Sequence, residues 1–419
     1  MRAVPIITQD GEAAGDTLWI VERRGIVAAA LVLAVAAWFG AEAVAPMAGL
    51  VLALAIVARS WSRLALVGLY CDLQFADERA FPDDEIGLTL SIENRGIIPI
   101  PWLEVDLTLP YGLYPVEVMP EKAWGSERAV HVLLTMLPFR AERRTYRLRC
   151  RVRGKFAVPD VALLVADPLR LFPRRVLYRV NTSLIVYPRV VQLESLGLGA
   201  RLPQGDVTLR TMLQPDPLRP IGVRDYRPGD SPRSIHWKAS ARRSQLQVKV
   251  LERTAQLQVA LYLDAGGFDH PWVVYRQTLF ERAVTATASI ASYVIERGGR
   301  VSLGTSGDDP TYVPPGGGID HLMLVLEALA VVASKRGRPI ESVLAASAWR
   351  QPGGTTLIAV VPEVRPEVAA ELLAARARRT PVAVVHGGYE KATAPDGVPL
   401  FSLGVDRDVN RALAQEHRQ

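Results

Sequence analysis

The feature that most constrains this chain is an almost uninterrupted apolar stretch from Gly25 to Ala58. One continuous helix over this stretch would be about 50 Å long, whereas the hydrocarbon core of a bilayer is about 30 Å thick. A single span would also place Glu42 and Pro46 near the bilayer centre, where a charge is costly. We therefore expect a turn at Glu42–Pro46 between two transmembrane helices, at about Gly25–Ala41 and Val44–Ala58.

The charges that flank this stretch predict its orientation. Arg23 and Arg24 precede the first span, Arg59 and Arg63 follow the second, and the turn holds no Lys or Arg. The positive-inside rule then predicts a multi-pass protein of the cell (inner or plasma) membrane with both termini and the soluble domains in the cytoplasm. A buried helical hairpin of a soluble protein is the alternative, although nothing nearby in the sequence would cover so much apolar surface. In the membrane-spanning arrangement, residues 1–24 form a disordered cytoplasmic tail and residues 25–63 hold the two transmembrane helices.

Charge and cysteine content narrow the class of partner. The chain has 49 Lys and Arg against 43 Asp and Glu, a net charge of +6, and its arginines are scattered. A nucleic-acid partner is not expected, because there is no basic stripe with interleaved aromatic residues, whereas anionic lipid would account for the excess of positive charge.

Cys71 and Cys150 are too few for a disulfide framework. Two reduced, buried thiols are expected, and a bridge between them stays open.

Between residues 70 and 190 the apolar periodicity changes to two. Alternation is clear in Glu85–Glu93, Trp102–Leu109 and Arg144–Val152, and turn residues such as Asn94-Arg95-Gly96 separate these runs. This pattern is typical of half-buried strands. Several short strands at such spacing predict a β-sandwich-like domain over residues 70–190.

From residue 257 onwards, expected strands and helices alternate along the chain. The strands are expected at Leu257–Leu263, Val301–Gly304, Leu357–Val361 and Val382–Val385, and the helices at Trp272–Glu296, Ile319–Ser334 and Pro366–Arg379. Such alternation implies a largely parallel sheet covered on both faces. We therefore predict an α/β domain of Rossmann type over residues 257–419.

Ligands of such sheets bind beyond the carboxyl ends of the strands. The candidates there are residues 264–267 (Asp-Ala-Gly-Gly) and 314–318 (Pro-Pro-Gly-Gly-Gly). Neither has the glycine spacing of a dinucleotide fingerprint, and no phosphate-cradling loop with Lys-Ser or Lys-Thr occurs. The six histidines are dispersed without metal-ligand spacing. We predict no cofactor and no catalytic residue.

The segment between the two domains, residues 191–256, carries the most distinctive pattern. Arg227-Pro228-Gly229-Asp230 predicts a type II turn, and a helix from Pro232 to about Ala241 would follow, capped by Asp230 or Ser231. Charges of both signs crowd this segment. Two readings stay open: a network of arginine–carboxylate pairs that locks the turn to the helix, or a surface that binds a partner or an anion. His236 as a general base is a third, although no nucleophile or orienting carboxylate accompanies it.

The signature of this segment consists of eight candidate interaction residues: Arg224, Tyr226, Gly229, Asp230, Arg233, Trp237, Lys238 and Arg242. Together with Arg153-Gly154-Lys155-Phe156 and the Asp-Pro-Leu-Arg-Leu-Phe run at residues 167–172, they closely resemble the domain-of-unknown-function fifty-eight (DUF58) family. The resemblance implies a von Willebrand factor A-like C-terminal domain. It also implies a pairing with MoxR-type AAA ATPases in a chaperone-like or assembly role, without an established biochemical activity.

One departure from that resemblance concerns metal binding. A metal-binding von Willebrand A domain carries Asp-x-Ser-x-Ser after its first strand, whereas this chain has Asp264, Gly266 and Phe268 at those positions. We predict a degenerate site without metal, in which Asp264 satisfies nearby backbone amides.

The leading hypothesis is a membrane-anchored, non-enzymatic scaffold or adaptor whose partners are the lipid bilayer and a MoxR-type ATPase. The alternatives are an enzyme acting on envelope or lipid precursors through Asp230, His236 or Asp264, and a metal-dependent adhesion module.

Overall fold

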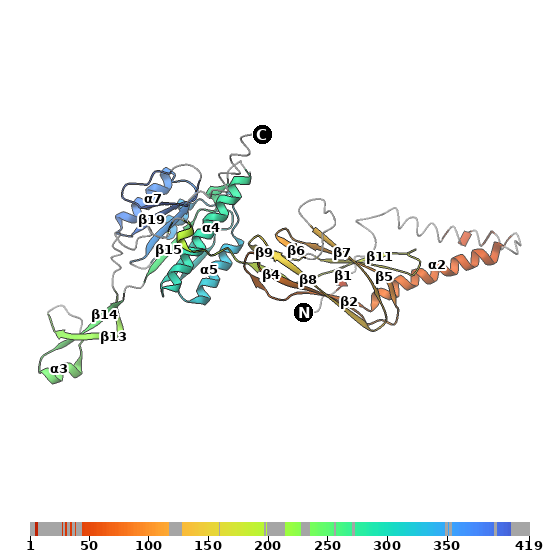
Figure 1. Cartoon of the computed structure of the whole chain (residues 1–419), viewed down its shortest axis with the longest axis horizontal. Coiled ribbons are helices and arrows are strands. Elements are labelled where there is room, and N and C mark those ends of the chain that lie inside the picture. The colour runs from red at the N-terminus through yellow and green to blue at the C-terminus, as the bar shows by residue number, and fades with distance from the viewer. Residues whose placement is uncertain are drawn as a thin grey trace. The chain divides into compact units, whose positions relative to one another are not determined.

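The computed structural model describes residues 5–6, 44–116, 128–158, 160–196, 198, 214–227, 235–254, 257–269, 273–347, 351, 354–388 and 392–403, and single positions between 27 and 38. The chain (Figure 1) divides into two compact units, Met1–Tyr187 and Pro188–Gln419. Of the predicted tail, residues 5–6 form the strand β1 (Pro5–Ile6), which pairs with residues 177–178. The rest of that tail lies outside the described residues.

Where the structure describes the apolar stretch continuously, from residue 44 on, it forms the long helix α2 (Val44–Val67). Pro46 lies in its first turn, where a missing backbone N–H costs little. The segment Pro46–Val67 of this helix is long and apolar enough to cross a membrane. The helix ends later than the predicted Ala58 because Ala58, Ser62 and Ala65 are buried. The described positions of the predicted first span are helical; Glu42 lies outside the described residues, so the two-span arrangement stays a prediction.

The rest of the first unit is rich in β-structure, as predicted, and is called the β-domain below. One sheet has the order β1, β11 (Arg174–Tyr178), β10 (Val161–Ala166), β5 (Ile100–Leu109), β7 (Arg128–Met136). A second has the order β2 (Leu69–Phe75), β4 (Glu85–Asn94), β8 (Arg140–Cys150), β6 (Leu113–Pro115). A small third sheet contains β3 (Arg79–Ala80), β12 (Ser183–Val186) and β9 (Gly154–Ala157). Strand β8 begins four residues before the predicted Arg144, since residues 140–143 pair with the end of β4.

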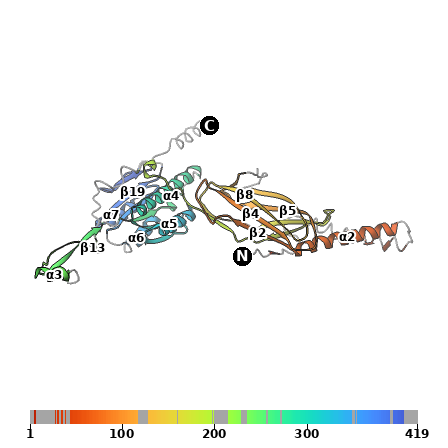
Figure 2. The same ribbon diagram turned by 60° about the horizontal axis from the view of Figure 1, so that its bottom comes forward.

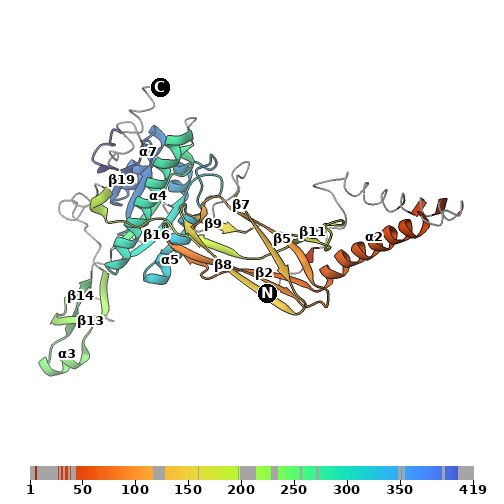
Figure 3. The same cartoon turned by 45° about the vertical axis from the view of Figure 1, so that its right-hand side comes forward.

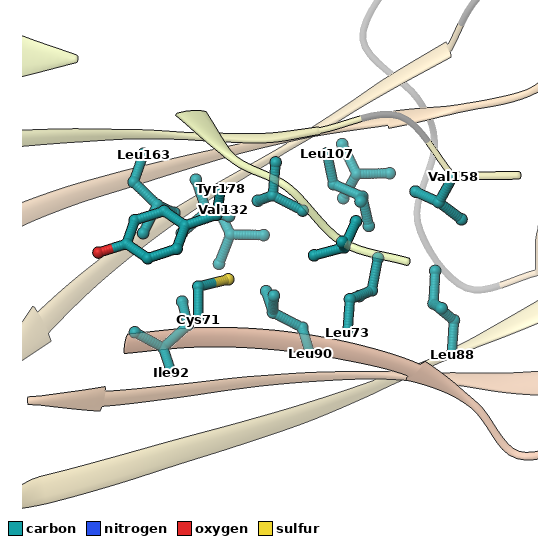
Figure 4. Packing of buried hydrophobic residues seen from close by; sticks show 14 of the residues in the cluster. Cys71, Leu73, Leu88, Leu90, Ile92, Leu107, Val132, Val158, Leu163 and Tyr178 are labelled. Atoms are coloured by element: carbon teal, nitrogen blue, oxygen red, sulfur yellow. The ribbon is translucent and has the colours of Figure 1, made fainter. Parts of the chain in front are cut away.

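Alternating side chains of the two larger sheets enclose one core. In β4 every second residue is buried, which places Leu88, Leu90 and Ile92 opposite side chains of the other sheet such as Leu107 and Leu163 (Figure 4). Both cysteines are buried here as free thiols, so the bridge that the sequence left open does not form. Burial raises the pKa of Cys71 to about 12 and that of Cys150 to about 11.

The second unit begins with residues that the sequence assigned to a linker. A short 3-10 helix η1 (Leu193–Leu196) packs on α4 (Val273–Glu296), and the Val191 amide donates to Ser289 Oγ at 3.0 Å. Leu193 and Leu196 are buried, because packing their apolar side chains against the helix removes them from water. The predicted boundary at residue 190 lies close to the division between the units at Tyr187, but residues 191–196 belong to the packed second unit and not to a linker. The signature follows in β13 (Gln214–Asp225), α3 (Trp237–Arg243) and β14 (Gln247–Thr254), with β13 and β14 antiparallel.

The remainder is the predicted α/β domain with a mostly parallel sheet. Its strand order is β17 (Tyr312–Gly316), β16 (Arg300–Thr305), β15 (Gln258–Leu263), β18 (Thr356–Val361), β19 (Val382–His386), β20 (Leu400–Ser402), and β17 is antiparallel to β16. Helices α4 and α5 (Ile319–Val331) pack together, as do α6 (Ile340–Ser347) and α7 (Pro366–Ala377); they can be followed in Figure 2. Three elements, β17, α6 and β20, were not predicted.

Candidate functional site

The polar cluster with the most chemical capacity lies at the carboxyl ends of the parallel strands. Asp264 follows β15, Ser306 follows β16 and His386 ends β19. Arg365 precedes α7 after β18, and Glu341 lies in the first turn of α6. This is the edge where open α/β sheets bind ligands. Because parallel strands end at a common edge, residues far apart in sequence meet here.

The Asp264 carboxylate is almost fully buried and half satisfied. Its Oδ1 accepts hydrogen bonds from the Gly267 amide at 3.0 Å and from Ser306 Oγ at 2.7 Å. The side chain is 1% exposed, and Oδ2 accepts no hydrogen bond from any described residue. The contact with a backbone amide was predicted; the contact with Ser306 was not.

The loop after β15 closes tightly over this carboxylate. A Cβ atom on Gly267 would come within 2.2 Å of Asp264 Oδ2, so only glycine fits there. The Gly266 amide donates to Ser306 Oγ at 3.2 Å. Phe268 is buried and packs against Phe280, with the two rings tilted and their centroids 5.6 Å apart. The two positions that would supply serine oxygens to a metal are therefore Gly266, which has no side chain, and Phe268, a buried aromatic residue.

A guanidinium takes the remaining side of the carboxylate. Arg365 Nη2 lies 3.5 Å from Asp264 Oδ2 and 3.3 Å from Glu341 Oε2. A positive group held between two carboxylates offsets their mutual repulsion. Its side chain is 35% exposed, so it remains accessible to an anion from solvent. Within the described ranges, no three His, Cys, Asp or Glu side chains are grouped to hold a metal ion.

Burial controls the protonation of this edge. It raises the pKa of Asp264 above its ordinary range, and the hydrogen bonds from Ser306 and Gly267 and the charge of Arg365 only partly offset this. Burial also lowers the pKa of His386, against a hydrogen bond to the Pro362 backbone and the charge of Glu363. A buried acid with a raised pKa, on the same sheet edge as a histidine with a lowered pKa, is a pattern found at functional sites and in structural networks alike.

The signature residues lie within residues 214–254 and are not part of this cluster. Trp237 begins α3 and is 69% exposed, and Arg224, Lys238 and Arg242 are exposed. Tyr226 is also exposed, and its amide donates to the Leu246 carbonyl at 2.9 Å. Gly229, Asp230 and Arg233, with the predicted type II turn, lie outside the described residues.

Helix α3 begins at Trp237 and not at the predicted Pro232. Ile235 forms a bridge with Val248 in β14 and is therefore extended. His236 serves as the cap, because its Nδ1 accepts from the Ala239 amide at 3.1 Å. A ring nitrogen used in this way is not free to accept a proton from a substrate. One polar link of this segment is a hydrogen bond of 2.5 Å from Gln247 Nε2 to Asp225 Oδ1.

The sequence identified Asp264 but missed Ser306, Glu341 and Arg365. Ser306 follows a strand, Arg365 precedes a helix and Glu341 lies in the first turn of another helix. Ser306 nevertheless lies 42 residues from Asp264. The available signal was positional: a polar residue directly after each predicted parallel strand. Applying that rule to β16 and β18 points to Ser306 and to the loop that holds Arg365.

Comparison with known proteins gives a family match to part of the chain and no activity. Residues 222–389 match the family described as "Protein of unknown function DUF58". "Uncharacterized protein YeaD" of Bacillus subtilis is 26% identical over 258 residues, which span 61% of this chain and 61% of that protein.

Two similar solved structures each cover less than a third of the chain. A CARDB domain from Pyrococcus furiosus has 10% identity and a TM-score of 0.19, covering 28% of this chain and 93% of that one. Alpha-2-macroglobulin of Escherichia coli has 13% identity and a TM-score of 0.22, covering 29% of this chain and 24% of that one. Likenesses at this level identify no ligand. The match at residues 222–389 confirms the resemblance of this part of the chain to the DUF58 family.

Proposed function

We propose that this protein is a membrane-anchored, non-enzymatic scaffold or adaptor that works with a MoxR-type AAA ATPase in an assembly role. In this proposal α2 and the apolar residues before it span the bilayer as a hairpin. Arg23, Arg24, Arg59 and Arg63 keep both termini and the soluble domains in the cytoplasm. The protein would bring its partner to the membrane surface.

The observation that carries the proposal is the exposed tryptophan of the signature. Trp237 is 69% exposed on a short helix that also presents Lys238 and Arg242. Tryptophan and arginine dominate the energetics of protein interfaces, because a large flat ring buries much area on binding. The exposed ring is more easily explained by a partner than by packing within the chain.

The α/β domain fits an interaction module of the von Willebrand A type. Along the chain its strands take the spatial order 3-2-1-4-5-6, with the third strand antiparallel, which is a doubly wound arrangement. Arg365 approaches the side of Asp264 where a metal would need an open position. This favours an adaptor over a metal-dependent adhesion module. The enclosed Asp264 and the capping role of His236 give little support to the enzyme alternative.

The test is co-purification of the tagged full chain from native membranes, with the partners identified by mass spectrometry. We expect a MoxR-type ATPase with the wild type and with Tyr111→Ala, a control that removes a ring 61% exposed on the β-domain. With Trp237→Ala, the amount of co-purified ATPase should fall tenfold or more. This corresponds to a loss of about 1.4 kcal/mol or more of binding free energy, as for an interface hot spot. Full retention by Trp237→Ala would contradict the assigned surface. No ATPase with the wild type would contradict the partner.

A further inference from the structure

One end of the β-domain displays large apolar side chains on three separate loops. Ile97 in the β4–β5 loop is 75% exposed and Phe139 in the β7–β8 connection is 70% exposed. Leu137 precedes Phe139, and Leu169 and Leu171 lie in the β10–β11 loop; all three are at least half exposed. These five side chains are called the collar. Exposed apolar groups gathered in this way mark a contact surface more often than chance.

Strand pairing places the three loops at the same end. Ile100, which begins β5, pairs with Met136 at the end of β7, and Trp102 pairs with Ala166 at the end of β10. The buried Asn94 side chain joins two of the loops, because its amide donates to the carbonyls of Ile98 at 2.9 Å and Leu137 at 3.3 Å.

The same end holds the anchor helix, which extends from it in Figure 3. The Trp61 indole donates to the Pro99 carbonyl at 3.0 Å, and the Arg95 amide donates to the Gly68 carbonyl at 2.7 Å. The β4–β5 loop therefore lies beside the last turns of α2. Trp61 stands between Arg59 and Arg63, the first basic residues after the apolar stretch Gly25–Ala58, and such aromatic and basic residues are enriched at membrane–water interfaces.

The backbone of two of these loops is unfavourable for the residues it carries. Phe139 and Arg170 have φ of 56° and 53°, a left-handed conformation that glycine or asparagine adopts at lower cost. Buried Asp167 fixes the second loop, because its carboxylate accepts from the amides of Leu169 at 3.0 Å and Phe172 at 2.7 Å. The fold thus holds the apolar side chains outwards in defined positions instead of tolerating them on a loose loop.

The exposed basic residues around the collar are three arginines, two of which are paired with glutamates. Arg95, Arg140 and Arg170 are exposed in or beside these loops. Glu93 and Glu104 pair with Arg95 and Arg170, and the single acid within residues 95–99, 137–140 and 167–173 is the buried Asp167. Basic residues beside a membrane helix attract anionic headgroups, each by about 1 kcal/mol.

We infer that the collar inserts into the headgroup region of an anionic bilayer beside the point where α2 enters it. This inference rests on the proposed membrane anchoring and adds a second contact. It would fix the β-domain against the membrane surface, since shallow burial of apolar side chains combined with basic residues binds proteins to the interface.

The test places an environment-sensitive nitrobenzoxadiazole label on the full chain. Phe139→Cys labels the collar, and Tyr111→Cys is the control, since Tyr111 is 61% exposed at the turn after Leu109, the opposite end of β5. The native thiols are buried and have raised pKa values, so they react far more slowly than an exposed cysteine. The labelled proteins are reconstituted in phosphatidylcholine vesicles with and without phosphatidylglycerol.

We expect both labelled proteins to float with the vesicles. The fluorescence emission of the label at position 139 should shift to the blue and be quenched by lipids that carry a spin label near the headgroup. The quenching should be stronger when phosphatidylglycerol is present. The label at position 111 should stay in water. Ile97→Cys repeats the test at an exposed residue should Phe139→Cys fail to fold.

The outcomes separate the collar from the anchor. Flotation without lipid quenching at position 139 overturns the collar and leaves the anchor intact. A blue shift without quenching means that another protein segment or a second copy covers the ring, which also overturns it. Equal quenching in neutral and anionic vesicles overturns the charge contribution, and failure of both proteins to float overturns the membrane anchoring itself.

Discussion

Two buried aspartates, one in each unit, make opposite use of the same chemistry. Asp167 in the β-domain is 0% exposed, and each of its oxygens accepts a backbone amide. Asp264 in the α/β domain is 1% exposed, but one oxygen accepts no hydrogen bond from a described residue and faces Arg365 instead. A carboxylate satisfied by amides holds a loop in place. A carboxylate satisfied in part retains capacity to respond to protons or to a neighbouring charge.

The largest effect is expected at Asp167. Asp167→Ala removes the acceptor of two amides, of which Phe172 N–H is buried, so the free energy of unfolding of the β-domain should fall by about 2–4 kcal/mol. Asp167→Asn keeps one acceptor oxygen and should lose about half as much. Both cysteines of the chain lie in this domain, so thiol modification of the full chain in detergent at rising urea measures the change. An unchanged urea midpoint in Asp167→Ala would show that the amides find other acceptors.

An intermediate effect is expected when Asp264 loses its cation. Arg365→Ala leaves the buried Oδ2 facing no charge, and breaking a buried pair is costly. Because the arginine is 35% exposed, solvent screening reduces the cost to about 1–2 kcal/mol. Amide hydrogen exchange in β15 and β18 should accelerate, while the thiol modification that reports on the β-domain should not change. Acceleration of both would mean that the two units unfold together.

The sequence predicted the regular elements better than the contacts at either aspartate. Strands β4 and β15 follow from alternation and from an apolar run, because burial of one or both faces imposes those patterns. Strand β17 was missed since its Pro314 and Pro315 lack the N–H donors of a central strand; they are tolerated at the edge of a sheet.

Helix ends and the polar site were harder to predict for a related reason. Pro232 is a favourable first helical residue, yet pairing of Ile235 with β14 delays the start of α3 to Trp237, and that pairing is tertiary. The Asp264 site draws on Ser306 and Arg365, which no spacing rule connects. Asp264 was chosen because it follows a strand whose type the sequence made plain, and the same position after β16 is that of Ser306.

The smallest effect, and the sharpest contrast, is the pH dependence at Asp264. Its folded-state pKa is raised above the ordinary 3.8, so the native protein binds this proton more tightly than the unfolded chain does. The stability that the proton contributes is present below about 3.8 and is lost as pH rises through the folded-state pKa. Asp264→Asn has no such titration. The unfolding temperature of wild type minus that of Asp264→Asn, measured by calorimetry of the full chain in detergent, should therefore decrease as pH rises from 3.8 towards neutrality. Parallel curves would show that Arg365 and the hydrogen bonds to Oδ1 already compensate for burial, which would make the two aspartates equivalent.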